Sequence, residues 1–568
     1  MPPDAAPAII TRAARPEDVE RLVNEGVPPL LARIYATRGV ASARDLATDF
    51  EQLALPGSML NLRNMADLLA GAIAARRKLL IVADYDADGA TACAVGMRAL
   101  RAFGADVGYL VPNRFEYGYG LSPEIVRLAH AQSRPDILIT VDNGIASFEG
   151  VAEANRLGME VLITDHHLPA ERLPEAACII NPNQPGCAFP SKHLAGVGVM
   201  FYLMLALRAE LRDRGAFGRG APNLADLLPL VALGTVADVV PLDRNNRILV
   251  QQGLNRIRAG RMQPGIAAMF QVAGRDAARA TARDLGFIVA PRLNAAGRLT
   301  DMALGIECLV TDDAERARAI AADLDRLNRE RRAIESGMRE EAMAAIESRE
   351  REESCTVSLF DPAWHQGVVG IVAGRMKERF HRPVIAFARA NPGEIRGSGR
   401  SIPGLHLRDA LDRVAVLHPG LILKFGGHAA AAGLTLRESD FKRFQQAFEE
   451  TARSLLTPAD LERVIETDGP LPAGGLTPET VSQLSAPVWG QGFPAPRFCD
   501  EFEVTAQRVV GERHLKLTLA QGGRSVDAIR FNFPESPPSR IRAVYQPTLN
   551  EFNGRTTVQL NIEYWEAA

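Results

Sequence analysis

Short apolar runs characterise the chain between residues 75 and 182. Helix-like segments separate these runs, and two of them begin at Ser122 and Ser147. Strands that alternate with helices at this spacing are typical of a parallel sheet with helices on both faces. We therefore expect an α/β lobe in this part of the chain. The runs that we interpret as strands are residues 79–83, 107–111, 136–141, 160–164 and 178–180.

The pattern changes along the rest of the chain. Helical periodicity dominates residues 193–284, and a highly charged segment at 312–351 contains no proline, which favours a long connecting helix. A second α/β pattern covers residues 356–455. Apolar and polar residues then alternate with a period of two, as at 514–519 and 557–562. This alternation indicates a small β-barrel or sandwich.

The length of 568 residues is too great for one hydrophobic core, and 47% hydrophobic residues are enough to fill several. We expect five segments with separate roles. They are a helical extension without recognisable chemistry at 1–55, an α/β lobe at 56–305, a connecting helix at 306–352, a second α/β lobe at 353–458 and a barrel domain at 459–568.

Composition excludes several classes of protein. No run approaches the roughly 20 apolar residues of a membrane span, and the N-terminus lacks the pattern of a signal peptide, so we expect a cytoplasmic protein without membrane contact. The six cysteines form no C-x-x-C pair, which disfavours a disulfide framework or a zinc knuckle. A net charge of −3 is mild evidence against a nucleic-acid binder.

Three carboxylates crowd into one turn, at Asp84, Asp86 and Asp88. The turn follows the apolar run at 79–83 and precedes a helix-like segment. Carboxylates this close repel one another, and a hard divalent cation is the usual means of neutralising them. The sequence therefore predicts half of a metal site at this turn.

Other candidate ligands occupy equivalent positions. Asp142 ends a later strand, Asp165-His166-His167 follows the next, and Asp238 lies further along. In open α/β sheets, ligands bind at the carboxyl ends of strands. Carboxylates with an imidazole suit Mn²⁺ or Mg²⁺ better than zinc, and a carboxylate-held metal pair is common in phosphoester hydrolysis.

Each of these features also has an ordinary interpretation. The acidic turn could be a calcium loop, although it lacks the glutamate that closes an EF-hand-type loop. Adjacent histidines such as His166 and His167 are often structural. Asp142 could cap the N-terminus of a helix. The order and spacing of the set are more specific than any of its members.

The ordered set resembles the DHH phosphoesterase superfamily, named for the triplet Asp165-His166-His167. A closer resemblance is to the bacterial RecJ family of single-strand-specific exonucleases, over about residues 30 to 435. The motifs that carry it are residues 84–89, 112–115, 118–120, 141–144, 164–167, 291–298, 364–370, 397–401 and 426–433.

This resemblance implies a two-lobed α/β core, a DHH lobe and a DHHA1 lobe joined by a long helix, followed by an OB-like barrel. It implies a 5′ to 3′ exonuclease that hydrolyses single-stranded DNA with a free 5′ end to 5′-mononucleotides by two-metal chemistry, in DNA repair and recombination. A single-strand-binding protein and a RecQ-type helicase are the implied protein partners. We expect a monomer, because the lobes already enclose a cleft.

Two alternatives stay open. One is a phosphodiesterase of the same superfamily that acts on oligoribonucleotides or cyclic dinucleotides; the long extension after Arg437 argues against it. The other is a non-catalytic scaffold of a replicative helicase, in which the metal ligands have decayed. The complete set of ligands argues against the second alternative.

The resemblance also assigns roles to individual residues. Two Mn²⁺ or Mg²⁺ ions would be bound, with Asp84 either a further ligand or a support for the others. His167 would contact the scissile phosphate or the leaving oxygen, and Asp165 would orient the histidines. The implied metal ligands are Asp86, Asp88, Asp142, His166 and Asp238.

A phosphate site is expected in the second lobe. Gly426-Gly427-His428 allows close approach of the backbone to an anion, and Arg400 and Ser401 are expected nearby, although a glycine pair can also form a simple tight turn. Arg292 and Arg298 are either phosphate contacts or salt-bridge partners. The further substrate-binding candidates are Asn294, His365, the possible base-stacking residues Phe115, Tyr117 and Tyr119, and Arg513, His514, Lys516, Arg530 and Arg555 of the barrel.

Overall fold

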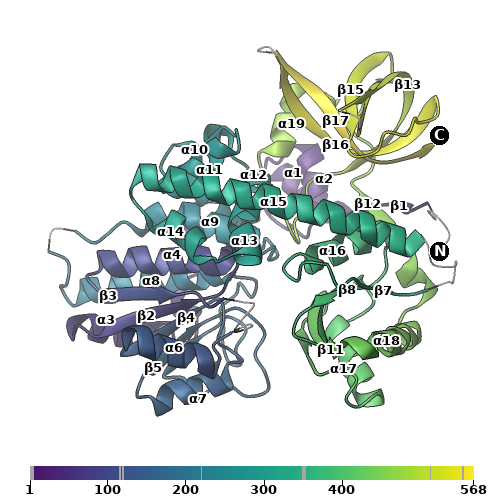
Figure 1. The fold of residues 1–568 in the computed structure, drawn as a ribbon. Coiled ribbons are helices and arrows are strands. Elements are labelled where there is room, and N and C mark those ends of the chain that lie inside the picture. The colour runs from purple at the N-terminus through teal and green to yellow at the C-terminus, as the bar shows by residue number, and fades with distance from the viewer. Residues whose placement is uncertain are drawn as a thin grey trace.

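The computed structural model describes residues 6–113, 117, 120–218, 220–347, 354–511, 513–552 and 555–568. Figure 1 shows two lobes joined by one long helix, with a barrel beside the second lobe. Among the described residues, no helix is long and apolar enough to cross a lipid bilayer. The expected class of fold, two α/β lobes with a connecting helix and a barrel, is confirmed.

The first lobe contains a fully parallel sheet in the order β3-β2-β4-β5-β6. All five expected strands are present, with bounds that agree to within one residue. The strands are β2 Lys78–Ala83, β3 Asp106–Leu110, β4 Ile137–Val141, β5 Glu160–Thr164 and β6 Cys178–Ile180.

Helices cover both faces of this sheet, because its strands are apolar on both sides. Leu79 and Ile81 of β2 belong to the core under α3, α4 and α8, whereas Leu80 and Val82 pack against α6 and α7. The helices are α3 Leu62–Ala74, α4 Ala87–Ala102, α6 Pro123–Ser133, α7 Phe148–Arg156 and α8 Gly196–Asp213.

A helical layer extends the core of the first lobe and leads into the connecting helix. The 34-residue α15 confirms the expectation of a long helix between the lobes. These helices are α9 Leu228–Ala237, α10 Arg244–Arg258, α11 Pro264–Val272, α12 Ala282–Asp284, the π-helix η6 Leu285–Val289, α13 Ala290–Leu299, α14 Ala303–Val310 and α15 Ala314–Glu347.

The second lobe has a mixed sheet in the order β10-β11-β9-β8-β7, in which β7 and β8 are parallel and the other pairs antiparallel. Its strands are β7 Val357–Phe360, β8 Val384–Arg389, β9 Glu394–Arg400, β10 Lys424–Gly427 and β11 Ala431–Arg437. Its helices are α16 Val369–Phe380, α17 Leu407–Leu417 and α18 Phe441–Leu455.

The C-terminal strands close into a five-stranded barrel in the order β13-β14-β15-β17-β16, which confirms the expected OB-like domain. Alternate residues such as Leu515, Leu517 and Leu519 fill its interior. The strands are β13 Phe498–Val510, β14 His514–Gln521, β15 Arg524–Arg530, β16 Arg540–Phe552 and β17 Arg555–Ala567.

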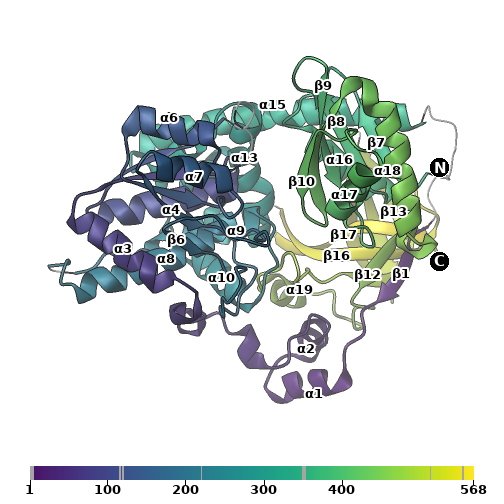
Figure 2. The same cartoon turned by 90° about the horizontal axis from the view of Figure 1, so that it is seen from below.

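The N-terminal extension contains a strand that the sequence pattern did not predict. β1 Ala8–Thr11 pairs in parallel with β12 Val464–Thr467, which precedes the barrel (Figure 2). The pattern gave no sign of β1, because four residues are too few for a periodicity and their partner is far along the chain. The helices α1 Pro16–Asn24 and α2 Pro29–Ala36 follow, and Ile34 of α2 packs into the barrel core with Leu484 of α19 Pro478–Ser485.

Short 3₁₀ helices complete the structure. They are η1 Ala43–Leu46, η2 Phe50–Gln52, η3 Pro56–Ser58, η4 Leu224–Leu227, η5 Ala277–Arg279, η7 Glu438–Asp440 and η8 Pro458–Leu461.

Candidate active site

The acidic turn lies between β2 and α4, as the sequence predicts. Asp86 is the N-cap of α4, and its Oδ1 accepts hydrogen bonds from the backbone N–H groups of Asp88 and Gly89, each at 3.0 Å. Position 89 requires glycine, because a Cβ there would lie 2.6 Å from the carbonyl oxygen of Asp84. The turn is therefore tight, and it holds the carboxylates at the carboxyl end of β2.

Asp88 is fully buried against the start of α8. Its two carboxylate oxygens accept hydrogen bonds from the N–H groups of Gly196, at 2.6 Å, and Val197, at 2.9 Å. The positive end of the helix dipole favours a carboxylate at this position. A second helix, α9, also lies close to Asp88: a Cβ added at Gly234 would lie 3.0 Å from Asp88 Oδ1.

Asp142 follows β4 with a left-handed backbone, at φ 62°. It does not cap a helix, since α7 begins at Phe148 and its N-cap residue is Ser147. A Cβ at Gly196 would lie 2.7 Å from the Asp142 Cβ. A strained backbone conformation at a site of converging side chains is typical of functional positions.

His166 brings the carboxylates together around one nitrogen atom. Its Nε2 lies 3.0 Å from Asp142 Oδ1, 3.4 Å from Asp238 Oδ2 and 3.9 Å from Asp88 Oδ2. Asp238 reaches this point from the C-terminal end of α9 rather than from a strand. The Nε2 atom is buried and makes no well-aligned hydrogen bond within the described part of the chain. Such an atom among carboxylate oxygens fits a metal ligand.

Among the residues that the structure describes, seven side chains near this point could hold cations. They form three groups, in each of which the ligand atoms lie within 4.8 Å of one another, and the groups share members. Every metal ligand expected from the sequence belongs to one of them, and Asp84 and His167 are included as well. The groups are Asp142 with His166 and His167, Asp88 with His166 and Asp238, and Asp84 with Asp86 and Asp142.

The electrostatics of the cluster also favour a cation. Burial and the charge of Asp86 raise the pKa of Asp88 to about 7, and burial and neighbouring carboxylates raise the pKa values of Asp142 and Asp238 well above the ordinary value. Burial lowers the pKa of His166 to about 4, so its ring is neutral, as a metal ligand must be. Oxygen-rich ligands with this much mutual repulsion fit Mn²⁺ or Mg²⁺.

Asp165 holds the two histidines in place. Its Oδ1 accepts hydrogen bonds from the backbone N–H groups of His166, at 2.7 Å, and His167, at 3.1 Å, and lies 2.7 Å from His167 Nδ1. Burial alone would lower the pKa of His167, but the bond to Asp165 and nearby carboxylates raise it to about 9. Burial would raise the pKa of Asp165, but its bond to His167 holds the value below the ordinary one.

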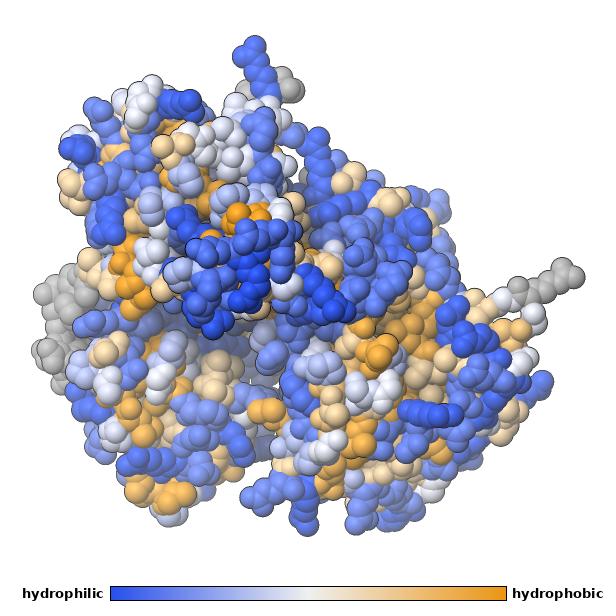
Figure 3. Space-filling view, turned by 180° about the vertical axis from the view of Figure 1, so that it is seen from behind, coloured by the Kyte–Doolittle hydropathy of each residue, from blue (hydrophilic) through white to orange (hydrophobic). Residues whose placement is uncertain are grey.

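The predicted phosphate site of the second lobe faces this cluster. The ring of His428 lies 6.0 Å from the ring of His167, and Figure 3 shows a hollow between the two lobes. Gly427 has φ 148°, and a Cβ there would lie 2.5 Å from the Ala431 carbonyl oxygen, whereas a Cβ at Gly426 would meet nothing within 4 Å.

Arg400 and Ser401 lie at the end of β9 in the same lobe. The Arg400 guanidinium is mostly buried, which lowers its pKa, and it donates to Ser398 Oγ at 3.2 Å and the Gly399 carbonyl at 2.8 Å. Ser401 Oγ donates to the Leu405 carbonyl at 2.8 Å. The structure therefore gives each of these predicted phosphate contacts a partner inside its own lobe.

The predicted contacts in α13 are held by protein partners. The buried Arg292 donates to Asp325 of α15 through Nε at 3.0 Å and Nη2 at 2.8 Å, so the salt-bridge alternative describes its position here. Asn294 Oδ1 accepts a hydrogen bond from the N–H of Ala87 at 2.9 Å.

Arg298 and His365 lie where the lobes meet. Arg298 Nη1 donates to the Gly367 carbonyl at 3.3 Å, and His365 Nδ1 accepts from the N–H of Gly367 at 3.1 Å.

The aromatic candidates Phe115 and Tyr119 lie outside the described residues, and Tyr117 packs against the core under α6 and α7.

Among the candidates in the barrel, Lys516 forms a salt bridge with Asp527 at 3.0 Å. The remaining barrel candidates vary in exposure. Arg530 lies between Phe533 and Trp565, His514 contacts the ring of Phe531, and Arg513 and Arg555 are exposed.

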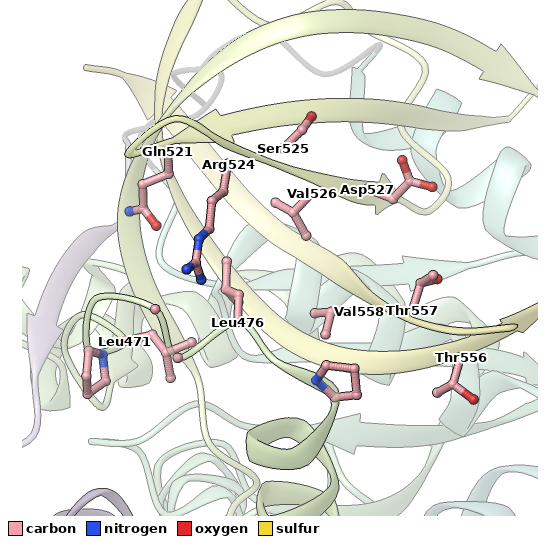
Figure 4. A pocket seen from close by; sticks show the side chains of 14 residues that line it. Leu471, Leu476, Gln521, Arg524, Ser525, Val526, Asp527, Thr556, Thr557 and Val558 are labelled. Carbon is pink, nitrogen blue, oxygen red and sulfur yellow. The ribbon is translucent and has the colours of Figure 1, made fainter.

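A cavity of about 570 Å³ lies on the barrel rather than at the carboxylate cluster (Figure 4). Leu471 and Leu476 line it from the segment before α19, Val526 from β15 and Val558 from β17, with Arg524 among the polar residues around it. None of the residues that the sequence singles out for chemistry lines this cavity.

Sequence reasoning missed the residues that support the cluster. Gly196 and Gly234 allow α8 and α9 to approach it, and Asn181 and Asn183 bond to the main chain of the two histidines. The asparagines follow β6, so their position at the end of a parallel strand was a usable signal. The glycines lie in helices and gave none.

Family models match three segments of the chain. They are the DHH family, N-terminal domain, at residues 78–235, the DHHA1 domain at 352–454 and the RecJ OB domain at 467–564. These matches agree with the two lobes and the barrel.

Known proteins are similar over nearly the whole length. The single-stranded-DNA-specific exonuclease RecJ of Dickeya dadantii is 51% identical, over 98% of this chain and 99% of that protein, and that of Escherichia coli is 51% identical over 94% and 96%. The crystal structure of RecJ in complex with Mn²⁺ from Thermus thermophilus matches with a TM-score of 0.83 at 30% identity, covering 99% of this chain and 79% of that one. The chain therefore belongs to the RecJ family of single-stranded-DNA-specific exonucleases.

Proposed function

We propose that this chain hydrolyses single-stranded DNA from a free 5′ end and releases 5′-mononucleotides, in DNA repair and recombination. The observation that supports the proposal best is the position of His166 Nε2 among three carboxylates, opposite the glycine-rich segment of the second lobe. Relatives with about half of their residues identical are named as exonucleases of this specificity.

Asp86, Asp88, Asp142, His166 and Asp238 would hold two Mn²⁺ or Mg²⁺ ions, with Asp84 beside them. When bound, such ions stabilise the charge that develops on a phosphoryl group during in-line displacement.

The protein's own groups would bind and orient the DNA. Asp165 fixes the ring of His167 through Nδ1, and this ring would contact a phosphate or a leaving oxygen on the side of the cluster that faces His428. His428 and the backbone of Gly426-Gly427 lie on the opposite wall, where an anion can be bound. The buried guanidinium of Arg400 adds positive charge to the same lobe.

The barrel would bind the strand beyond the cleft, because OB-like barrels present basic and aromatic residues to unpaired bases. His514 and the half-exposed Phe531 form one such aromatic surface. We also propose that the chain acts as a monomer in the cytoplasm and that a single-strand-binding protein and a RecQ-type helicase supply its substrate.

A comparison of substrates at one Mn²⁺ concentration tests this function. The substrates are a single-stranded DNA labelled at its 3′ end, the same strand with a blocked 5′ end, the matching duplex and an RNA dinucleotide. We expect stepwise shortening of the unblocked strand only, with mononucleotides as product. Faster consumption of the dinucleotide, or equal degradation of the 5′-blocked strand, would exclude the proposed substrate or polarity.

A further inference from the structure

Two asparagines hold the main chain of the tandem histidines. After β6 the chain reads Asn181-Pro182-Asn183. Asn183 Nδ2 donates to the His166 carbonyl at 2.7 Å, and Asn181 Nδ2 donates to the His167 carbonyl at 2.8 Å. Asn181 Oδ1 in turn accepts from the N–H of Asn183 at 2.7 Å. The two amides thus form one connected unit behind both histidines.

This unit is itself fixed by the surrounding loop. Asn181 is fully buried, and its carbonyl accepts from the N–H of Gln184 at 3.2 Å. Lys192 Nζ donates to the carbonyl of Pro182 at 2.7 Å. Asn183 is partly exposed, so it can be changed with less damage to the core than Asn181. These hydrogen bonds connect the loop after β6 to the main chain of both histidines.

The choice of asparagine has a chemical reason. The carbonyls of His166 and His167 need hydrogen-bond donors, and a carboxamide supplies them without charge. An aspartate of the same shape would offer no donor when ionised and would add a negative charge beside the existing carboxylates. The asparagines therefore bind the histidine backbone without competing with a cation for the ring nitrogens.

We propose that Asn181 and Asn183 are positioning residues that hold the tandem histidines against the carboxylates, and that Asn183 thereby sets the affinity of the His166 site for a divalent cation. The inference rests on the proposed function, because it takes His166 as a metal ligand. Groups that orient metal ligands typically change metal affinity or activity by about 10- to 100-fold when removed.

The test is the binding of Mn²⁺ to the full-length, DNA-free protein, followed by the electron paramagnetic resonance signal of unbound Mn²⁺. We expect Asn183→Ala to weaken binding about 10- to 100-fold, with its metal-free unfolding temperature close to that of the wild type. Asn183→Gln keeps the amide donor and should recover part of the affinity. High Mn²⁺ should restore the rate of nucleotide release of Asn183→Ala, as a purely structural defect would not allow.

Asn155 supplies a matched control. Its Nδ2 also donates to a main-chain carbonyl, that of Glu175 at 2.9 Å, but at an exposed position in α7. Asn155→Ala should bind Mn²⁺ like the wild type. If Asn183→Ala does not fold, Asn183→Ser takes its place, since a serine hydroxyl is too short to reach the same carbonyl.

The outcomes separate this inference from the proposed function. If the wild type binds Mn²⁺ and degrades single strands while Asn183→Ala binds equally tightly, the inference is wrong and the function stands. The same follows if Asn155→Ala loses as much affinity as Asn183→Ala. If the wild type binds no Mn²⁺, the proposed function fails and the inference fails with it.

Discussion

Asp142 has a left-handed backbone conformation that few residue types adopt. Aspartate and asparagine tolerate φ of about 60° better than most side chains, and Gly196 leaves the space that the Asp142 side chain needs. Burial and the repulsion by neighbouring carboxylates such as Asp88 and Asp238 disfavour the ionised form of Asp142, and a bound cation offsets this cost. The residue is thus placed for a cation rather than for the stability of the metal-free fold.

The substitution Asp142→Asn tests this interpretation. It keeps the shape and the tolerance of a left-handed backbone but removes one charge. We expect the rate of nucleotide release to fall roughly 1,000-fold, equivalent to about 4 kcal/mol. The metal-free unfolding temperature of the first lobe should rise by roughly 2–4 °C for about 1 kcal/mol of relieved repulsion, the shift expected for an unfolding unit of about 150–250 residues. Scanning calorimetry with and without Mn²⁺ measures the unfolding temperature.

The control for that experiment is Asp106→Asn, at the exposed opposite end of the sheet, which should change neither the rate nor the unfolding temperature. A metal-free Asp142→Asn protein that is clearly less stable than the wild type would contradict the account of repulsion.

On the scale of elements, the packing of α9 against α4 and α8 depends on a helical glycine. A Cβ at Gly234 would lie 2.1 Å from Thr91 Oγ1 and 2.7 Å from a methyl group of Val197. Since Asp88 lies between these helices, any displacement of α9 also moves Asp238 at its end. Packing and metal binding are therefore coupled in this region.

We expect Gly234→Ala to destabilise the protein by about 1–3 kcal/mol, because the added methyl group overpacks the core. Urea unfolding measures the change, and a Mn²⁺ titration should show weaker binding. Gly71→Ala in α3 is the matched control, since its Cβ would meet nothing within 4 Å; alanine there should be neutral or stabilising by up to about 1 kcal/mol. Equal effects of the two substitutions would refute the packing argument.

Elements with a strong local signal could be predicted from the sequence. β5 and β6 have the expected bounds because buried parallel strands are continuous apolar runs, and the acidic turn follows from the same pattern. The pairing of β1 with β12 and the salt bridge of Arg292 to Asp325 depend on distant partners, which periodicity does not reveal. The domain boundaries and the roles of the site residues stay predictions.

On the scale of the whole molecule, the N-terminal extension joins the barrel to the first lobe. Arg38 donates to both carboxylate oxygens of Asp468, at 2.7 and 3.0 Å, and both side chains are 1% exposed. Tyr35 stacks on Trp489 and Phe493 of the segment before the barrel, and Arg247 of α10 lies 4.2 Å from the Phe493 ring. The extension therefore has a structural role.

Removing the buried guanidinium with Arg38→Ala should lower the free energy of unfolding by roughly 3 kcal/mol, because Asp468 loses its main partner. A looser barrel should slow degradation of long single strands more than that of short oligonucleotides. Urea unfolding and rates on two strand lengths check both effects. Arg44→Ala, at an exposed position of η1, is the control and should change neither the free energy of unfolding nor the two rates. If Arg38→Ala slowed the degradation of long and short strands equally, the barrel would have no role in holding the strand.

The most direct test of the central claim, that the cluster around His166 is a two-cation centre for hydrolysis of single-stranded DNA, is a Mn²⁺ titration with nucleotide release measured in the same samples. For the wild type we predict two bound ions per chain and release that rises with their binding. His166→Ala should bind fewer ions and release no nucleotides while keeping its fold. Release by the wild type in excess chelator, or wild-type binding and rate in His166→Ala, would contradict the account.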